Sequence, residues 1–303
     1  MRETAYAKLN LALHVRAREP DGYHRIETVF AFCEDGDELE AGEPRQPNRI
    51  DLDVAGAFAE ALSPAGRGLG EGAERSCSSR EAEPPHPSHL PAGDREHSGN
   101  LVHRAASALA QRFGITRGVR LRLDKRLPVA AGIGGGSADA AAALRLLVRW
   151  WELPGDDPAL HEIARSLGAD VPACLASRTV GGEGRGDVLT EVDGSALTGR
   201  PVLLVNPRVP VPTGPVFAAW DGVDRGPLGS ALVGRNDLEA AARAIAPVIG
   251  DVLEALAGAP IAAMSGSGAS CFGLYEIETD RDAAAARIAA ARPHWWLLRT
   301  RLR

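Results

Sequence analysis

Residues 128–141 read Pro-Val-Ala-Ala-Gly-Ile-Gly-Gly-Gly-Ser-Ala-Asp-Ala-Ala, so four glycines and a serine come directly before an alanine-rich, helix-forming segment. Glycines carry no side chains, which allows several backbone N–H groups to converge on one anion. Ser137 adds a hydroxyl, and a helix that begins here adds the positive end of its dipole. The stretch predicts a phosphate-binding loop, whose glycines are Gly132, Gly134, Gly135 and Gly136.

Two commoner phosphate motifs do not fit this stretch. A Walker A loop needs a Gly-Lys-Ser/Thr ending, and no lysine follows these glycines. A dinucleotide fingerprint would open a βαβ unit near the start of a domain, with an acidic residue about 20 positions further on. The remaining alternative is a glycine loop that precedes a helix and binds no ligand.

Composition excludes several classes of function. The chain has 303 residues and 45% hydrophobic content, which is enough for one large or two moderate domains, and we expect two lobes. A net charge of −6 argues against a nucleic-acid or membrane-surface role, because both need a basic face. No segment reaches the roughly 18 apolar residues of a membrane span. The four cysteines form no Cys-x-x-Cys pair, which favours a reducing cytoplasm over a disulfide framework or a zinc site.

Hydrophobic periodicity predicts an α+β fold. Alternating polar and apolar residues predict strands in the first half at 9–16, 26–32, 49–54 and 119–123. Helical spacing predicts helices there at 101–113 and about 136–151. In the second half we expect helices at 158–167, 237–249, 252–257 and 281–291, and strands at 202–206, 261–264, 271–275 and about 295–300. A short helix after residue 170 has Asp170 at its N-cap position and Pro172 in its first turn.

Residues 63–98 differ in composition from the rest of the chain. They are rich in Gly, Pro, Ser, Glu and Arg, and they cannot bury enough apolar surface to order themselves. The segment is predicted to be a mobile insertion within an N-terminal domain of residues 1–155, which a C-terminal domain of residues 156–303 follows. Its three histidines, His86, His89 and His97, could suggest a metal tract, but a solvated loop is favoured.

Lysine is rare in this chain. Of the 34 basic residues only Lys8 and Lys125 are lysines. A compact ammonium fits a tight phosphate site in which a planar guanidinium does not, so either lysine is a candidate ligand there. Chance retention is the alternative.

Six short motifs occur in one order along the chain. They are Ala7-Lys-Leu-Asn-Leu11, Asp21-Gly-Tyr-His24, Asn100-Leu101, Asp124-Lys-Arg-Leu-Pro128 with its glycine loop, Gly168-Ala-Asp-Val-Pro172 and Ser265-Gly-Ser-Gly268. This order resembles the GHMP kinase superfamily of galactokinase, homoserine kinase, mevalonate kinase and phosphomevalonate kinase. The resemblance covers almost the whole chain outside residues 63–98, although an insertion before Asn100 is unusual for the family.

The resemblance implies a two-lobed GHMP-kinase fold. The N-terminal lobe would hold a mixed sheet and the glycine-rich phosphate loop at a helix N-terminus, the C-terminal lobe would be α+β, and catalysis would take place between them. The Ala-Lys-Leu-Asn-Leu and Asp-Gly-Tyr-His motifs are similar to those of members that use ATP and Mg²⁺ to phosphorylate the 2-hydroxyl of 4-diphosphocytidyl-2-C-methyl-D-erythritol in the non-mevalonate isoprenoid pathway. The implied partner is a small molecule with a CDP moiety, and the implied state is a monomer or weak homodimer.

The resemblance also implies roles for individual residues. Lys8 and Asp170 match the family's catalytic pair, and Asn10 matches a neighbouring active-site amide. Tyr23 and His24 match the cytidine-recognition turn, and Phe217 matches an aromatic that stacks on cytosine. The implied ATP site comprises Asn100, Leu101, Gly132, Gly134, Gly135, Gly136 and Ser137. The metal ligands stay open.

These residue types suit phosphoryl transfer, which needs a carboxylate to accept the hydroxyl proton and a cation to stabilise charge. Asp170 would be the base and Lys8 the cation. Simpler interpretations are a helix cap for Asp170, a solvated strand face for Lys8 and core packing for Phe217. Asp139 is a second candidate base, although beside a triphosphate it would repel the substrate unless a magnesium ion intervened.

Two other functions remain open at this point. One is a GHMP-type kinase that acts on another small alcohol or sugar and does not need the cytosine-recognition residues. The other is a non-catalytic sensor of the same fold that binds nucleotide and sugar.

Overall fold

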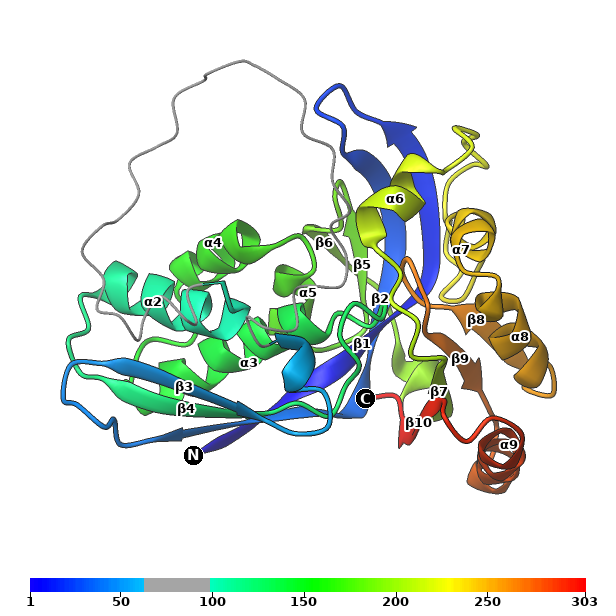
Figure 1. Cartoon of the computed structure of the whole chain (residues 1–303). Coiled ribbons are helices and arrows are strands. Elements are labelled where there is room, and N and C mark those ends of the chain that lie inside the picture. The colour runs from blue at the N-terminus through cyan, green and yellow to red at the C-terminus, as the bar shows by residue number, and fades with distance from the viewer. Residues whose placement is uncertain (63–98) are drawn as a thin grey trace, which may run out of the picture.

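The computed structural model describes residues 1–62 and 99–303. The predicted insertion at 63–98, with its three histidines, lies outside the described residues. Two sheets with helices packed around them make up the described fold, as Figure 1 shows. The α+β class expected from the sequence is confirmed.

The first sheet has six strands and is mixed. Along it the order is β3, β4, β2, β5, β6, and β1 pairs with β2. Among the described strands of this sheet, β3 and β4 are parallel to each other and the other neighbouring pairs are antiparallel. The strands are β1 (Arg2–Arg18), β2 (His24–Gly42), β3 (Ile50–Ala55), β4 (Val119–Asp124), β5 (Val180–Glu183) and β6 (Val188–Glu191).

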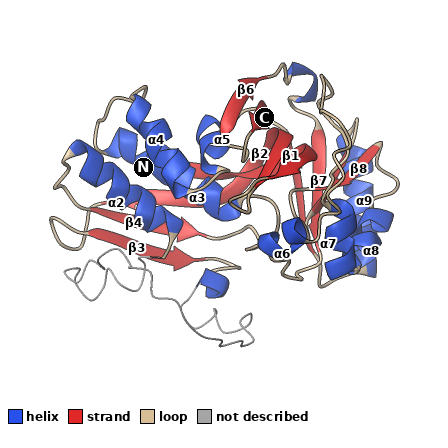
Figure 2. Cartoon of the chain, turned by 90° about the horizontal axis from the view of Figure 1, so that it is seen from above, coloured by secondary structure: helices blue, strands red, loops and turns tan. Residues whose placement is uncertain are grey.

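Four helices lie beside this sheet (Figure 2): the first two in chain order contact its strands, and the next two pack against those helices. They are α2 (Leu101–Phe113), α3 (Gly135–Trp150), α4 (Pro158–Leu167) and α5 (Val171–Ala176). The alanines of α3 are almost fully buried, which lets this helix lie close to the sheet and to its neighbours. A short 3₁₀ turn, η1 (Glu60–Leu62), ends the described part of the segment before the insertion.

The second sheet has four antiparallel strands in the order β10, β7, β9, β8. They are β7 (Pro201–Asn206), β8 (Ile261–Met264), β9 (Cys271–Leu274) and β10 (Trp296–Arg301). The accompanying helices are α6 (Thr213–Ala218), α7 (Glu239–Ile245), α8 (Val248–Ala255) and α9 (Glu278–Ala291), and the 3₁₀ turn η3 (Ser195–Leu197) precedes β7.

Strand β1 joins the two parts of the fold. Ala7, Leu9 and Leu11 are buried in an apolar cluster together with Leu204 of β7 and Phe272 of β9. Because side chains alternate along a strand, the residues between them belong to the opposite face. The junction between the sheets therefore determines where the polar residues of β1 lie.

The predicted helix over 237–249 is wrong. The structure has two shorter helices, since α7 ends at Ile245 and α8 begins at Val248, with Pro247 at the N-cap of α8. Proline has no N–H to continue a helix, but it fits a helix start. The predicted helix over 252–257 is the second part of α8. The division of the chain near residue 155 stays a prediction, and β5 and β6, from beyond that residue, pair with the first sheet.

Candidate active site

A cavity of about 700 Å³ lies where β1, the glycine loop and α6 meet. Its wall also includes the turn before β2, the start of α5 and the turn between β8 and β9. Twelve of the thirteen predicted site residues line it, and Asn100 is the exception. The structure thus brings the sequence motifs together in one place, while the role of each residue stays a prediction.

Lys8 and Asp170 form an ion pair in this cavity. The Lys8 Nζ lies 3.1 Å from the Asp170 Oδ2, and only 3% of the Lys8 side chain is exposed. Lys8 also donates a 2.8 Å hydrogen bond to the Asn10 Oδ1. The Asn10 Nδ2 donates in turn to the Thr28 hydroxyl at 2.8 Å, which fixes the orientation of the amide. An ammonium has three donors, so Lys8 retains one for a ligand.

Asp170 is at the N-cap position of α5, but its side chain makes no capping hydrogen bond. Its backbone is helical there, with φ −80° and ψ −17°, whereas capping residues usually have extended backbone. The interpretation of Asp170 as a helix cap alone is therefore wrong. Its carboxylate is 37% exposed and lies in the cavity wall, where it can accept a proton.

The glycine loop adopts backbone conformations that suit glycine. Gly132 has φ +73°, and Gly134 has φ +65° at the N-cap of α3. A Cβ added to Gly132 would lie 2.4 Å from the Ser265 carbonyl oxygen, and one added to Gly134 would lie 2.8 Å from the Lys8 Cε. The loop therefore packs tightly against both the Ser265 turn and the Lys8 side chain.

Ser265 connects the second glycine-serine turn to the same place. Its hydroxyl donates to the Gly132 carbonyl at 2.9 Å and accepts from the Asn10 backbone N–H at 3.1 Å. The backbone N–H of Lys8 donates to the Ile133 carbonyl at 3.1 Å. Hydrogen bonds thus join the two glycine-rich segments to β1, the strand that carries Lys8 and Asn10.

The other end of the cavity is aromatic. The His24 ring is 5.1 Å from that of Phe217 and 5.8 Å from that of Trp220, measured between centroids. Tyr23 is 55% exposed, and the Arg185 guanidinium lies 3.7 Å from the centre of its ring. These aromatic rings can stack on a flat heterocycle, and the ring nitrogens of His24 can form hydrogen bonds with its edge.

Burial lowers the pKa of His24, and the nearby Arg18 lowers it further. The ring is therefore neutral at pH 7 and offers one donor and one acceptor nitrogen. Those two groups suit hydrogen bonds to a nucleobase edge.

Sequence reasoning missed Trp220 and Arg185. Trp220 follows Phe217 by three residues, the spacing of neighbours on a helix, and this was the available signal. Arg185 stands between two glycines in a turn and has no local pattern that could identify it.

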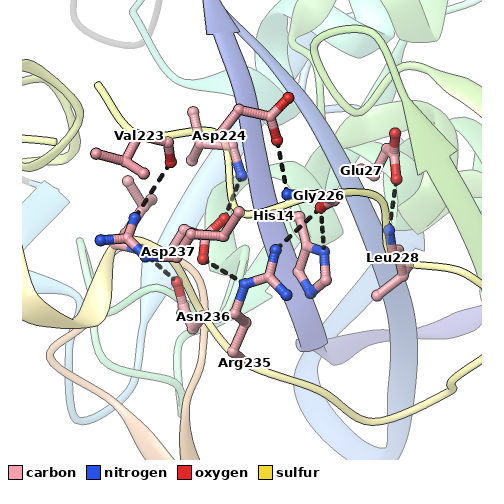
Figure 3. Close-up of polar contacts among 12 residues, drawn as sticks. His14, Glu27, Val223, Asp224, Gly226, Leu228, Arg235, Asn236 and Asp237 are labelled. Atoms are coloured by element: carbon pink, nitrogen blue, oxygen red, sulfur yellow. Dashed lines mark hydrogen bonds and ion pairs between the residues drawn. The ribbon is translucent and has the colours of Figure 1, made fainter. Parts of the chain in front are cut away.

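The segment at 221–237, which follows α6, forms hydrogen bonds with residues of β1 and β2. In Figure 3 the side chains of His14 and Arg235 both point to the Gly226 carbonyl, with distances of 3.3 and 3.0 Å. The Glu27 carboxylate accepts from the Leu228 N–H at 2.7 Å. These contacts hold the chain beyond Phe217 against β1, which carries Lys8 and His14, and against β2, which carries Glu27.

Two other predicted residues have different surroundings. The Asn100 side chain accepts from the Val102 N–H at 2.9 Å and so caps α2, whereas Leu101 lines the cavity. The second candidate base, Asp139, is not in the cavity wall, because its carboxylate is buried against Lys125. The structure thus removes the ground for Asp139 as a base, and the part of Asn100 in the ATP site stays a prediction.

Comparisons with known proteins agree with this geometry. Residues 100–178 match the family described as GHMP kinases N terminal domain, and residues 224–294 match GHMP kinases C terminal. The chain is 52% identical to a protein of Rhizorhabdus wittichii over 99% of this chain and 94% of that protein, and 48% identical to one of Sphingopyxis alaskensis over 100% and 99%. Both relatives are named 4-diphosphocytidyl-2-C-methyl-D-erythritol kinase.

Solved structures give the same result. A crystal structure of 4-(cytidine 5'-diphospho)-2C-methyl-D-erythritol kinase matches with a TM-score of 0.73 and 31% identity, covering 100% of this chain and 99% of that one. A mevalonate kinase at 11% identity, with a TM-score of 0.62 over 100% and 99% of the two chains, shares the fold. In the described part of the chain, no helix combines the length and apolarity that crossing a bilayer requires. By its full-length relatives and its two GHMP kinase domains, the chain belongs to the 4-diphosphocytidyl-2-C-methyl-D-erythritol kinase family.

Proposed function

We propose that the chain transfers the γ-phosphoryl group of ATP to the 2-hydroxyl of 4-diphosphocytidyl-2-C-methyl-D-erythritol, a step of the non-mevalonate route to isoprenoid precursors. The observation that carries the proposal is the Lys8–Asp170 ion pair, which lies in one cavity with the glycine loop and the aromatic group. The names of the relatives supply the substrate.

The reaction needs a base and a cation at the same oxygen. The Asp170 carboxylate accepts the proton of the 2-hydroxyl as that oxygen attacks the γ-phosphorus, a new P–O bond forms, and the bond to the β-phosphate oxygen breaks to release ADP. Lys8 stabilises the negative charge that develops on the transferred group. The 2.8 Å hydrogen bond from Lys8 to Asn10 keeps its ammonium next to Asp170.

The two ends of the cavity would bind the two nucleotides. The N–H groups at the start of α3, with the Ser137 hydroxyl, would hold the ATP phosphates. At the other end, Tyr23 and Phe217 would stack on the cytosine, and the neutral His24 would hydrogen-bond to its edge. The acceptor hydroxyl would then lie between them, beside Lys8 and Asp170.

Mg²⁺ is the expected metal. Among residues 1–62 and 99–303 no three or more His, Cys, Asp or Glu side chains gather around one point. This fits an ion held mainly by the ATP phosphates, with one or two protein ligands, as Mg²⁺ commonly is. Ser137, which follows the glycine loop, is a cavity residue that could supply such an oxygen, and bound Mg²⁺ would neutralise phosphate charge. We also propose a cytoplasmic monomer or weak homodimer.

A substrate panel tests the proposal. The purified chain is given ATP and Mg²⁺ with the CDP-linked methylerythritol, mevalonate, homoserine or galactose, and ADP release is measured. We expect turnover of the CDP-linked substrate alone. Turnover of only the other alcohols would point to a different GHMP kinase. Ligand binding without any turnover would point to a sensor.

A further inference from the structure

The second lysine lies in a buried charged cluster beneath the glycine loop. The Lys125 Nζ is 2.6 Å from the Asp139 Oδ2 and also pairs with the Asp37 carboxylate. The exposed fractions of the side chains are 1% for Lys125, 0% for Asp37 and 4% for Asp139. None of the three lines the cavity, so the proposed reaction does not use them directly.

The cluster fixes both ends of the glycine loop. At the entrance, the Asp37 Oδ1 accepts from the backbone N–H groups of Arg126 and Leu127, at 2.5 and 2.7 Å. At the exit, Asp139 belongs to the second turn of α3 and reaches back to Lys125. The Lys125 ammonium thus connects the end of β4, which precedes the glycine loop, to α3, which follows the loop.

The ammonium also lies directly under the start of α3. A Cβ added to Gly135, the first residue of the helix, would be 3.1 Å from the Lys125 Nζ. The backbone at this position belongs to the proposed phosphate site. A displacement of the ammonium would therefore shift the N–H groups that face the ATP phosphates.

Stability alone explains the cluster poorly. Two carboxylates and one ammonium sum to −1 when all are ionised, and the buried Asp139 Oδ1 has no hydrogen-bond partner in the described structure. Burial raises the pKa of Asp139, as does the neighbouring Asp37, against the lowering effect of Lys125. A buried ion pair is often no more stable than well-packed apolar residues of similar size. If the cluster served stability alone, apolar side chains of similar size could take its place.

We propose that Lys125 is a positioning residue for ATP, whose bonds to Asp37 and Asp139 hold the glycine loop in the shape that binds the phosphates. The inference rests on the proposed use of ATP, and it concerns one end of the cavity only. It predicts a selective defect in binding adenine nucleotides that carry β- and γ-phosphates.

The test compares Lys125→Met with Arg126→Met. Arg126 is the adjacent residue and its side chain forms exposed ion pairs with Glu38 and Asp124. Calorimetry measures the Kd of a non-hydrolysable ATP analogue and of CDP for each variant and for the unmodified chain. We expect Lys125→Met to raise the Kd of the ATP analogue about tenfold or more and that of CDP less than about twofold. Arg126→Met should change neither.

A second pair of variants serves if Lys125→Met does not fold. Asp139→Ala removes the bond between the helix and Lys125, whereas Asp139→Asn retains an oxygen that accepts from the ammonium. We expect Asp139→Ala to raise the Kd of the ATP analogue and the KM for ATP, with the KM for the CDP-linked substrate unchanged, and Asp139→Asn to restore most of the affinity. Normal ATP-analogue affinity in Asp139→Ala, even with a lower Tm, would overturn the inference.

The unmodified chain separates the inference from the proposed function. If it binds CDP but not the ATP analogue, the proposed function fails before Lys125 is considered. If it binds both, and the variants bind both equally well, only the role of Lys125 fails.

Discussion

The Lys8 ammonium and the Asp170 carboxylate lie 3.1 Å apart, although β1 carries one and the start of α5 carries the other. Further hydrogen bonds fix the position of Lys8 and of the helix that follows Asp170. Lys8 donates to Asn10, and the far end of α5 is bound by Arg145 of α3. This anchoring keeps the two charges at one wall of the cavity, so changes at either anchor should affect the reaction as well as the fold.

Replacing the proposed base gives the first prediction. Asp170→Asn keeps the shape of the side chain but removes its ability to accept a proton. We expect kcat to fall by about 10²- to 10⁴-fold, with the Kd of an ATP analogue nearly unchanged. Steady-state kinetics and calorimetry check this. A kcat within tenfold of the unmodified chain would assign the base to another group.

The Arg145 anchor gives the second prediction. Its guanidinium donates to the Cys174 carbonyl at 2.7 Å and the Ser177 hydroxyl at 2.9 Å, at the C-terminal end of α5, and pairs with Glu3. Arg149, one turn further along α3, pairs with the same glutamate and donates to the Arg2 carbonyl, so both of these partners belong to β1.

Arg145→Met should therefore lower kcat about tenfold or more, because Asp170 loses its alignment, and Arg149→Met should leave it within about twofold. Both variants lose an ion pair with Glu3, and the lower Tm measures that shared effect. Only Arg145→Met also loses the bonds to the end of α5, and the change in kcat measures that effect. Equal effects of the two variants on kcat would show that α5 does not depend on Arg145.

Most of the site residues predicted from the sequence line the cavity, but the sequence did not predict the contacts that hold those residues in place. The helices at 101–113 and 158–167 have the predicted bounds, because local periodicity and caps determine them. Strands β5 and β6 and helix α6 were not predicted, since they are short and gain their stability from neighbours distant in sequence. Arg145 and Arg185 were missed because only their tertiary contacts distinguish them from ordinary surface arginines.

Phe217 provides the third prediction. Its ring lines the aromatic end of the cavity, 5.1 Å from that of His24, and the proposed cytosine would stack on it. Phe217→Ala should raise the KM for the CDP-linked substrate by roughly tenfold, as loss of one base stack does, and leave the KM for ATP unchanged. Phe217→Tyr retains a ring and is the matched control. A parallel rise in both KM values would indicate general loosening of the fold.

The two glycines at opposite ends of the loop should respond differently to alanine. At Gly132, φ is +73° and a Cβ would lie 2.4 Å from a backbone oxygen, so Gly132→Ala should cost at least about 1–3 kcal/mol and lower Tm by several degrees. Gly136 lies within α3, and a Cβ there would be 3.5 Å from the nearest atom, on Leu101. Gly136→Ala should keep or slightly raise Tm. Thermal unfolding decides, and a lower Tm for both would contradict the geometry.

The lowered pKa of His24 leads to a prediction about stability and pH. Burial and Arg18 favour the neutral ring in the folded state, whereas in the unfolded chain His24 titrates near its ordinary value of 6.5. Above that value both states hold the ring neutral and His24 contributes no pH dependence. As pH falls below 6.5 the unfolded chain binds the proton first, so the free energy of unfolding decreases until the folded pKa is passed.

His24→Asn removes this titration and leaves the other acid-sensitive groups in place. The difference in the free energy of unfolding between the unmodified chain and His24→Asn should therefore be constant from pH 8 to pH 7 and shift against the unmodified chain as pH falls from 6.5 towards 5. Urea unfolding at matched pH values measures it. A difference independent of pH would mean that the folded and unfolded states titrate alike, and one that shifts in favour of the unmodified chain on acidification would mean that the His24 ring is held as a cation.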